Sequence, residues 1–296
     1  MKSRLLLTLV ILAVLNGLVS LWVGQKAYGW MPVQASAEAV LVDNLFSFLT
    51  TLGTFIFLGV VGVLVYAVLF QRVGKYDVGD GPPIEGNVRL EVVWTAIPLV
   101  LVLWIAAYSF RIYDQMGILG PMDHRMGMAV AAVVVDQPIE VRSRQWAWEF
   151  HYPEHHVTST ELHLPVNQRA KLLLTSEDVL HGFYIPAFRI KQDIIPGRDI
   201  DFEFTPTREG RYRLRDSDYS GTYFAANQSH VVVESPEAYQ QWLEAAAQQP
   251  PTVAENPAFQ EFSRSVENPI SLGWPSVQPA PAPVVNYASS EANSYE

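Results

Sequence analysis

The sequence contains no cysteine among its 296 residues. This absence excludes disulfide bonds, thiolate zinc sites, cysteine-ligated iron–sulfur clusters, cysteine nucleophiles and copper centres bridged by thiolates. Charged residues make up only 17% of the chain, whereas ordinary soluble domains contain about 25%. Basic residues are outnumbered 20 to 30, and the net charge of −10 argues against a nucleic-acid partner. Because 49% of the residues are hydrophobic, the composition indicates a membrane protein with a soluble part.

Long apolar runs without charge stand near the N-terminus, at residues 5–25, 45–70 and 92–110. Each reaches or approaches the roughly 20 residues that a helix needs to cross about 30 Å of hydrocarbon. The second and third runs therefore predict a transmembrane hairpin over residues 41–112. The first run, within residues 1–40, has two interpretations: a retained anchor, or a secretory signal that is cleaved.

Lysine and arginine residues flank these runs unevenly. Lys2 and Arg4 precede the first run, and Arg72, Lys75 and Arg89 lie between the second and the third. Because basic flanking residues favour the cytoplasmic side, we expect both groups there. The domain after the third run is then expected on the outer side, whether or not the first run is cleaved.

After the third run, the pattern changes to short apolar segments, several of them alternating with polar residues and separated by Gly, Pro, Asn and Asp. These segments predict a β-sandwich or Greek-key barrel over residues 127–248. A helix is expected to follow Ser235, an N-cap residue before Pro236, and to run through Leu243. The polar and proline-rich tail at 249–296 is expected to be mostly disordered. The expected strands lie at residues 133–135, 139–141, 171–174, 200–204, 212–214 and 231–233.

Four further segments are informative together: 89–98 (RLEVVWTAIP), 145–150 (QWAWEF), 178–188 (DVLHGFYIPAF) and 191–198 (KQDIIPGR). In this order, they resemble subunit II of the haem-copper terminal oxidases. The resemblance implies a transmembrane hairpin that packs on a large haem-bearing subunit I, followed by a cupredoxin-like β-barrel. The expected fold class is therefore an α + β membrane protein, with an extra N-terminal anchor or signal ahead of the hairpin.

Cytochrome c oxidases of this family carry a dinuclear copper centre in the barrel. Its ligands are a histidine of the D-V-x-H segment and a later C-x-E-x-C-x₃-H-x₂-M run, whose two thiolates bridge the metal ions. The first ligand position in this chain is His181. Both thiolates, the second imidazole and the thioether are missing, so we expect no copper here and no cofactor in this chain, with haem and copper in subunit I. The later ligand positions, counted without a gap, hold Asp216, Asp218, Ser220, Phe224 and Asn227.

The missing ligands bear on the electron donor. The bo-type quinol oxidases of the same superfamily also lack this centre, and the loop at 81–87 (GPPIEGN) resembles cyanobacterial oxidase subunits. The resemblance therefore implies a non-redox subunit of a proton-translocating oxidase that reduces dioxygen to water and takes electrons from quinol. We expect oxidase subunits I and III and membrane lipid as partners, in a bacterial plasma or thylakoid membrane, with the C-terminal domain periplasmic or lumenal. Two alternatives stay open: a cytochrome c oxidase subunit 2 with another electron entry, or a non-catalytic docking or assembly subunit.

Other residues acquire candidate roles from the same resemblance. Glu91 lies in the L-E-x-x-W-T motif, where the family has an acid at the cytoplasmic mouth of a proton channel; the alternative is an ordinary interfacial acid. Trp146 matches an aromatic cluster of the family, but a tryptophan packs equally well in a core or at an interface. Asp193 and Arg198 are candidates for contact with subunit I, or else form a plain surface ion pair. Asp218 replaces a glutamate that also reaches a magnesium site, and its shorter side chain puts that metal in doubt.

Overall fold

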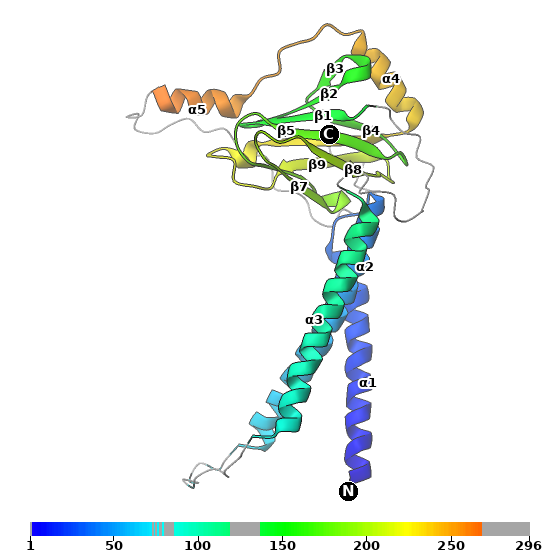
Figure 1. Ribbon diagram of the computed structural model, residues 1–296, viewed down its shortest axis with the longest axis vertical. Coiled ribbons are helices and arrows are strands. Elements are labelled where there is room, and N and C mark those ends of the chain that lie inside the picture. The colour runs from blue at the N-terminus through cyan, green and yellow to red at the C-terminus, as the bar shows by residue number, and fades with distance from the viewer. Residues whose placement is uncertain are drawn as a thin grey trace. The chain divides into compact units, whose positions relative to one another are not determined.

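The computed structural model contains two compact units, a helical unit and a β-domain (Figure 1). The helical unit comprises residues 1–30 and 43–115, and the β-domain comprises residues 31–42 and 116–296. The expected strand at 133–135 lies outside the described residues. The structure describes residues 2–72, 74, 76, 79, 86–118 and 137–267.

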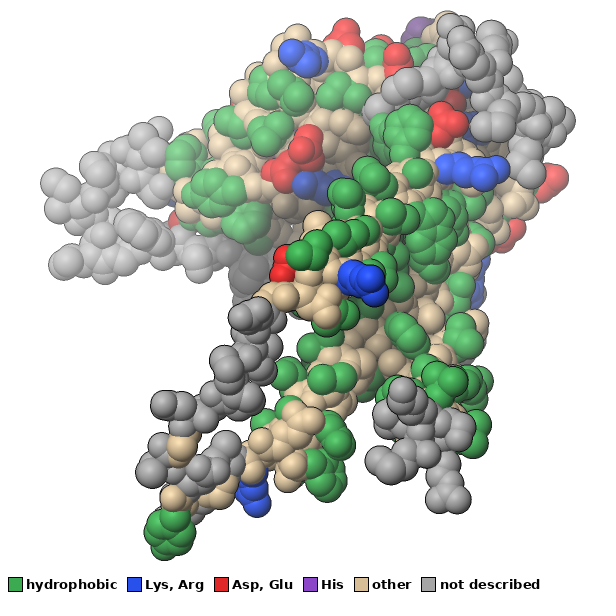
Figure 2. Space-filling view, turned by 60° about the horizontal axis from the view of Figure 1, so that its bottom comes forward, with side chains coloured by type: hydrophobic (Ala, Val, Ile, Leu, Met, Phe, Trp, Pro, Cys, Tyr) green, Lys and Arg blue, Asp and Glu red, His purple; other side chains and the backbone are tan. Residues whose placement is uncertain are grey.

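Three long helices carry the apolar runs: α1 (Lys2–Ala27), α2 (Ala37–Phe70) and α3 (Val88–Met116). Each is long and apolar enough to cross a membrane. Hydrophobic side chains lie exposed along all three, as lipid-facing helices require (Figure 2). The side chain of Asn87 starts α3, because its Oδ1 accepts hydrogen bonds from the backbone N–H groups of Arg89 (3.1 Å) and Leu90 (3.3 Å). The expected hairpin is therefore confirmed.

Helix α1 packs on α2 through small and polar residues. The Ser47 hydroxyl donates to the Gly24 carbonyl (2.8 Å), and the Asn16 amide donates to the Phe55 carbonyl (3.0 Å). A Cβ atom at Gly24 would lie 1.9 Å from the Thr51 hydroxyl, so the close approach of the two helices requires glycine there. Small residues and interhelical hydrogen bonds are the usual means of association between membrane helices. This packing favours a retained anchor, which stays a prediction.

The β-domain consists of two five-stranded sheets, in the strand orders β3-β2-β1-β5-β8 and β4-β10-β9-β6-β7. Burial alternates along most strands, and five phenylalanine side chains are fully buried in the core. This arrangement is the expected cupredoxin-like domain. The strands are β1 (Ile139–Arg144), β2 (Ala147–Tyr152), β3 (Val157–Ser159), β4 (Leu162–Pro165), β5 (Ala170–Ser176), β6 (His181–Ile185), β7 (Ile190–Ile194), β8 (Ile200–Phe204), β9 (Gly210–Asp216) and β10 (Gln228–Glu234). Short 3₁₀ turns are η1 (Tyr28–Trp30), η2 (Pro153–His155), η3 (Pro186–Phe188) and η4 (Phe224–Ala226).

Two helices follow the last strand. As expected, Ser235 caps α4 (Pro236–Ala247), and its hydroxyl accepts a hydrogen bond from the Ala238 backbone N–H (3.2 Å). A second helix, α5 (Pro257–Glu267), lies within the tail for which the sequence predicts disorder. Asn256 caps it by accepting a hydrogen bond from the Phe259 N–H (3.0 Å). The helix is strongly amphipathic, and its apolar face gains a partner that composition alone does not reveal.

Arg169, just before β5, holds two chain segments that lead toward the helical unit. Its guanidinium donates to the buried Glu38 carboxylate (3.2 Å), to the Glu203 carboxylate (2.9 Å) and to the Gly117 carbonyl (2.8 Å). The Glu38 carboxylate also accepts from the Thr205 backbone N–H (3.2 Å). The start of α2 is therefore attached to this edge of the β-domain by an ion pair, and the residues after α3 are attached to it by a hydrogen bond to the Gly117 carbonyl.

We expect Gly24→Leu to destabilise the helical unit by about 1–3 kcal/mol, the usual penalty for overpacking, because the new side chain collides with Thr51. The matched control is Gly17→Leu on the same helix, since a Cβ atom at Gly17 meets nothing within 4 Å. The measurement is thermal unfolding of the full chain in detergent, followed by circular dichroism. Equal losses in the two variants would contradict the described α1–α2 packing.

Candidate functional site

The strand ends of one sheet bring four of the six predicted ligand positions together. His181 opens β6, Asp216 closes β9, and Ser220 and Asn227 lie in the loop between β9 and β10. Strands β6 and β9 pair antiparallel with Phe183 opposite Asp216, so the start of one lies beside the end of the other. All four residues are buried, with exposed fractions between 0% and 6%.

The side chains at the other two positions do not join this cluster, although the Asp218 backbone N–H donates to the Asp216 carboxylate (3.1 Å). Asp218 directs its Oδ1 to the Lys191 ammonium (3.0 Å). Phe224 lies in η4 and packs on Tyr219, with ring centroids 5.3 Å apart.

The centre of the cluster is an acid–histidine–acid contact, which we call the His181 network: His181, Asp178, Asp216 and Asn227. The His181 Nδ1 lies 2.7 Å from the Asp216 carboxylate, and its Nε2 lies 2.9 Å from the Asp178 carboxylate. The Asn227 amide donates to Asp216 (3.1 Å), and the Gly182 backbone N–H donates to the other Asp216 oxygen (2.7 Å). Each ring nitrogen of His181 therefore faces a carboxylate oxygen, and the Asn227 amide nitrogen also lies 3.3 Å from Nδ1.

The geometry favours the charged form of the ring. Burial by itself lowers the pKa of His181, but hydrogen bonds and charges from Asp216 and Asp178 outweigh it and raise the pKa above its usual value. Burial likewise raises the pKa of Asp216, yet the hydrogen bonds from His181 and the Gly182 N–H leave the pKa lowered. Burial also raises the pKa of Asp178, but the hydrogen bonds from His181 and from the backbone N–H groups of Gln145 and Val179 leave the pKa lowered. The network thus favours protonation of the His181 ring between the two carboxylates.

This donor set does not fit a dinuclear copper centre. Such a centre needs two bridging sulfur atoms, whereas Asp216 and Ser220 offer only oxygen at the two thiolate positions. Phe224 has no donor atom, and Asn227 replaces the thioether. Both ring nitrogens of His181 are already engaged by carboxylates, so neither nitrogen is open to a metal ion.

Two tryptophan side chains hold the loop between β9 and β10. The Trp148 indole N–H donates to the Asn227 carbonyl (3.2 Å), and its ring lies 6.2 Å from the His181 ring. The Trp146 indole N–H donates to the Ser220 carbonyl (3.1 Å). Trp146 is only 4% exposed, so its observed role is packing and hydrogen bonding within the β-domain.

The remaining candidate residues lie apart from the His181 network. Asp193 on β7 is exposed and contacts the Lys191 ammonium (3.2 Å), which also binds Asp218. Hydrogen bonds from Asp218 and Asp193 raise the pKa of Lys191, and this ammonium occupies one oxygen of Asp218. Arg198 is exposed in the turn after β7. Glu91 lies exposed in the first turn of α3, within the helical unit.

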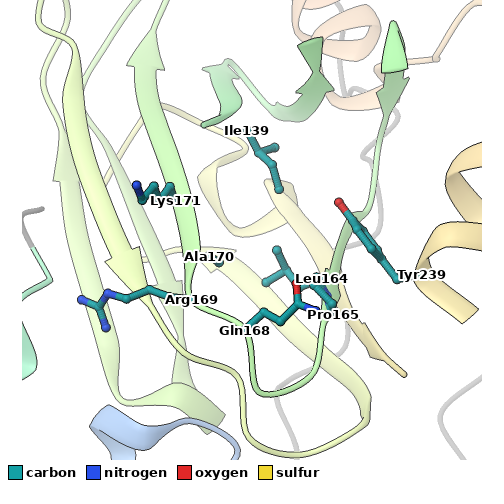
Figure 3. Close-up of a pocket in the computed structure, with 8 residues that line it drawn as sticks. All are labelled: Ile139, Leu164, Pro165, Gln168, Arg169, Ala170, Lys171 and Tyr239. Atoms are coloured by element: carbon teal, nitrogen blue, oxygen red, sulfur yellow. The ribbon is translucent and has the colours of Figure 1, made fainter. Parts of the chain in front are cut away.

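Sequence reasoning gave no role to Asp178, although it lies in the same D-V-x-H segment as His181. The spacing of three residues was the available signal, because a turn before a strand can fold such an acid back onto the histidine. The described residues also line a pocket away from these candidates, where Arg169 and Lys171 extend away from Tyr239 (Figure 3). None of the predicted site residues lines it, and Arg169 is already engaged by Glu38 and Glu203.

Comparisons with known proteins agree with the two-part organisation. Residues 20–112 match the family model "Cytochrome C oxidase subunit II, transmembrane domain", and residues 157–235 match "Cytochrome C oxidase subunit II, periplasmic domain". The chain is 39% identical over 275 residues to cytochrome c oxidase subunit 2 of Synechocystis sp., covering 81% of this chain and 82% of that one. It is 37% identical over 265 residues to cytochrome c oxidase subunit 2 of Thermostichus vulcanus, covering 76% and 80%.

A solved structure is also similar. It is the periplasmic domain of subunit II of cytochrome oxidase from Bradyrhizobium japonicum, with 26% identity and a TM-score of 0.36. The match covers 38% of this chain and 93% of that one.

We expect the His181 network to make stability depend on pH. The raised pKa of His181 means that its stabilisation is complete below the unfolded value of about 6.5 and is lost as pH rises through the folded pKa. The lowered pKa values of Asp178 and Asp216 mean that their stabilisation is present above about pH 4 and is lost as pH falls through the folded values. The stability difference between wild type and His181→Gln should therefore be largest between about pH 4 and 6.5.

The measurement is urea unfolding of the full chain in detergent at several pH values, followed by tryptophan fluorescence. The control is His151→Gln on β2, a half-buried histidine bonded to the Thr158 hydroxyl (3.0 Å). A difference between wild type and His181→Gln that stays constant into alkaline solution would show that the ring is not held as an imidazolium.

Proposed function

The chain belongs to the cytochrome c oxidase subunit II family, and from this premise we propose that it is a copper-less subunit II of a quinol-fed haem-copper terminal oxidase. The complex reduces dioxygen to water in a respiratory chain. The observation that carries the proposal is the His181 network, in which the ligand positions His181 and Asp216 bond to each other and His181 also contacts the Asp178 carboxylate. Within the complex, this chain supplies a membrane anchor and an outer domain, and the redox chemistry belongs to subunit I.

The donor atoms at the ligand positions decide which route an electron can take into the complex. An electron entering through the outer domain needs a redox group there, and the available oxygen donors do not hold two copper ions close enough to share one electron. The charged pairs of the His181 network stabilise the same strand ends without any metal. Electrons then reach subunit I from a donor dissolved in the membrane, and a quinol has that chemistry.

Contacts with other subunits follow from the exposed residues. Asp193 and Arg198 are exposed at the end of β7 and in the following turn, so they remain our candidates for contact with subunit I. Trp146 has little surface left for such a contact, because it is 4% exposed within the chain itself. The apolar surfaces of α2 and α3 provide area for lipid and for subunits I and III.

A second candidate is a cytochrome c oxidase whose electrons enter by another route. It is favoured by the names of the relatives from Synechocystis sp. and Thermostichus vulcanus, both cytochrome c oxidase subunit 2. Both candidates share the same fold and membrane anchor, so only the donor and the metal content distinguish them.

Oxygen uptake by the purified complex distinguishes the two candidates. We expect turnover with a reduced quinol and no turnover with reduced cytochrome c alone, because the outer domain lacks a redox group. The near-infrared absorption of a mixed-valence copper pair should also be missing. Cytochrome c-driven turnover in the absence of quinol, or that absorption band, would refute the proposal. His181→Gln should leave quinol turnover unchanged in complexes that remain assembled, since the network has no redox role.

We further propose that Glu91 accepts protons from the cytoplasm for the complex. Expected effects are lower turnover and lower proton uptake in Glu91→Gln, because the amide removes the titratable group, and partial recovery in Glu91→Asp. The matched control is Asp114→Asn, which neutralises an exposed acid near the other end of α3. The measurements are oxygen uptake and proton uptake by the complex in vesicles. Equal behaviour of Glu91→Gln and Asp114→Asn would leave Glu91 as an ordinary interfacial acid.

A further inference from the structure

Helix α5 lies on the β-domain at the turn that carries Trp146. The Phe262 ring meets the Trp146 ring edge to face, with centroids 5.4 Å apart and planes at 82°. The Asn256 amide, which caps the helix, donates to the Gln145 carbonyl (3.0 Å). Ala258 is 3% exposed, so the first turn of the helix also buries a side chain. Helix α5 is therefore attached at its N-terminus and by an aromatic contact one turn later.

The surface beneath α5 is built to hold Trp146 in one position. The Ser220 carbonyl accepts hydrogen bonds from both the Trp146 indole (3.1 Å) and the Gln145 amide (2.7 Å). The Tyr223 ring packs against Trp146, with centroids 5.1 Å apart. Gly221 has a φ of +112°, and a Cβ atom there would lie 2.6 Å from the Gln145 amide and 3.1 Å from the Trp146 ring. These contacts fix the Trp146 and Tyr223 rings, and Phe262 of α5 packs on another side of the Trp146 ring.

The two faces of α5 differ as a docked helix requires. Ala258 and Glu261 are buried and Phe262 is half-buried, whereas Phe259 is 47% exposed and Arg264 points into solvent. An edge-to-face aromatic pair adds about 0.5–1.5 kcal/mol beyond the area that it buries. Only residues 248–256 separate α5 from the end of α4, and such a short linker gives a high effective concentration of the helix at its site.

We propose that the aromatic surface of Trp146 and Tyr223 is a docking site for the chain's own helix α5, which covers Trp146 against contact with other proteins. The occupant is a segment of this chain, already seated through Phe262, Asn256 and Ala258. The covering of Trp146 by α5 goes beyond the proposed function, because it is expected whether quinol or cytochrome c feeds the complex. A soluble protein that reaches this turn of the β-domain meets the outer face of α5, which carries Phe259, Gln260 and Arg264, instead of the tryptophan.

Hydroxyl-radical footprinting of the assembled complex, read by mass spectrometry at individual tryptophans, tests the cover. Phe262→Ala removes the aromatic contact and should raise the oxidation rate of Trp146 several-fold. Phe259→Ala removes a phenyl ring from the exposed face of the same helix and should leave the oxidation rate of Trp146 at the wild-type value. Trp148, fixed within the β-domain by the Asn227 carbonyl (3.2 Å), is the internal reference and should stay protected throughout.

Each other outcome overturns the proposal. Equal oxidation of Trp146 in wild type and Phe262→Ala means that α5 does not cover it. Equal increases in both phenylalanine variants mean that the seating of α5 does not depend on its buried face. A parallel rise at Trp148 in Phe262→Ala means that Trp146 becomes exposed by opening of the β-domain and not by loss of a cover, which also counts against the proposal. Asn256→Ala, which loses the helix cap and the bond to Gln145, should raise Trp146 oxidation in the same direction as Phe262→Ala, and protection equal to wild type counts against the cover.

Discussion

The β-domain depends on the pairing of a fully buried histidine with two carboxylates. An imidazole with an ionised carboxylate at each ring nitrogen can donate to both only when both nitrogens carry protons, because a neutral ring turns one lone pair toward a carboxylate. Removing one member of such a buried pair is costly, since it leaves a charge without a partner. The His181 network joins the start of β6, the end of β9 and the last residue of the following loop. Those strand ends owe their geometry to ionic contacts among their own side chains.

The same rule governs the segments that lead to the membrane helices. Glu38 is 2% exposed at the start of α2, and Arg169 supplies its counter-charge while also binding the Gly117 carbonyl. A single guanidinium serves several acceptors there because its donors form a rigid fork. Buried charges are therefore paired both at the copper-ligand positions and where the chain enters and leaves the β-domain.

In the proposed complex, the redox role and the structural role belong to different subunits. Subunit I is expected to hold the redox groups, while this chain offers charge pairs, packed aromatic rings and three helices of membrane-spanning length. Trp146 has a structural role of this kind. Its indole N–H donates to the Ser220 carbonyl, and Phe262 of α5 packs against its ring. A tryptophan enclosed in this way serves packing within the domain.

The sequence by itself determined the membrane helices, the change from helices to a β-domain, the family and the identity of the residues at the ligand positions. Apolar runs, alternation and short motifs are local properties, so they can be read along the chain. Tertiary structure alone decided that Asp178 and Asp216 enclose His181, that Arg169 binds a carboxylate 131 residues away, and that a helix in the expected disordered tail covers Trp146. The reason is that a buried charge or an amphipathic face can be satisfied by many residues, and only the folded sheets determine which of them lies within reach.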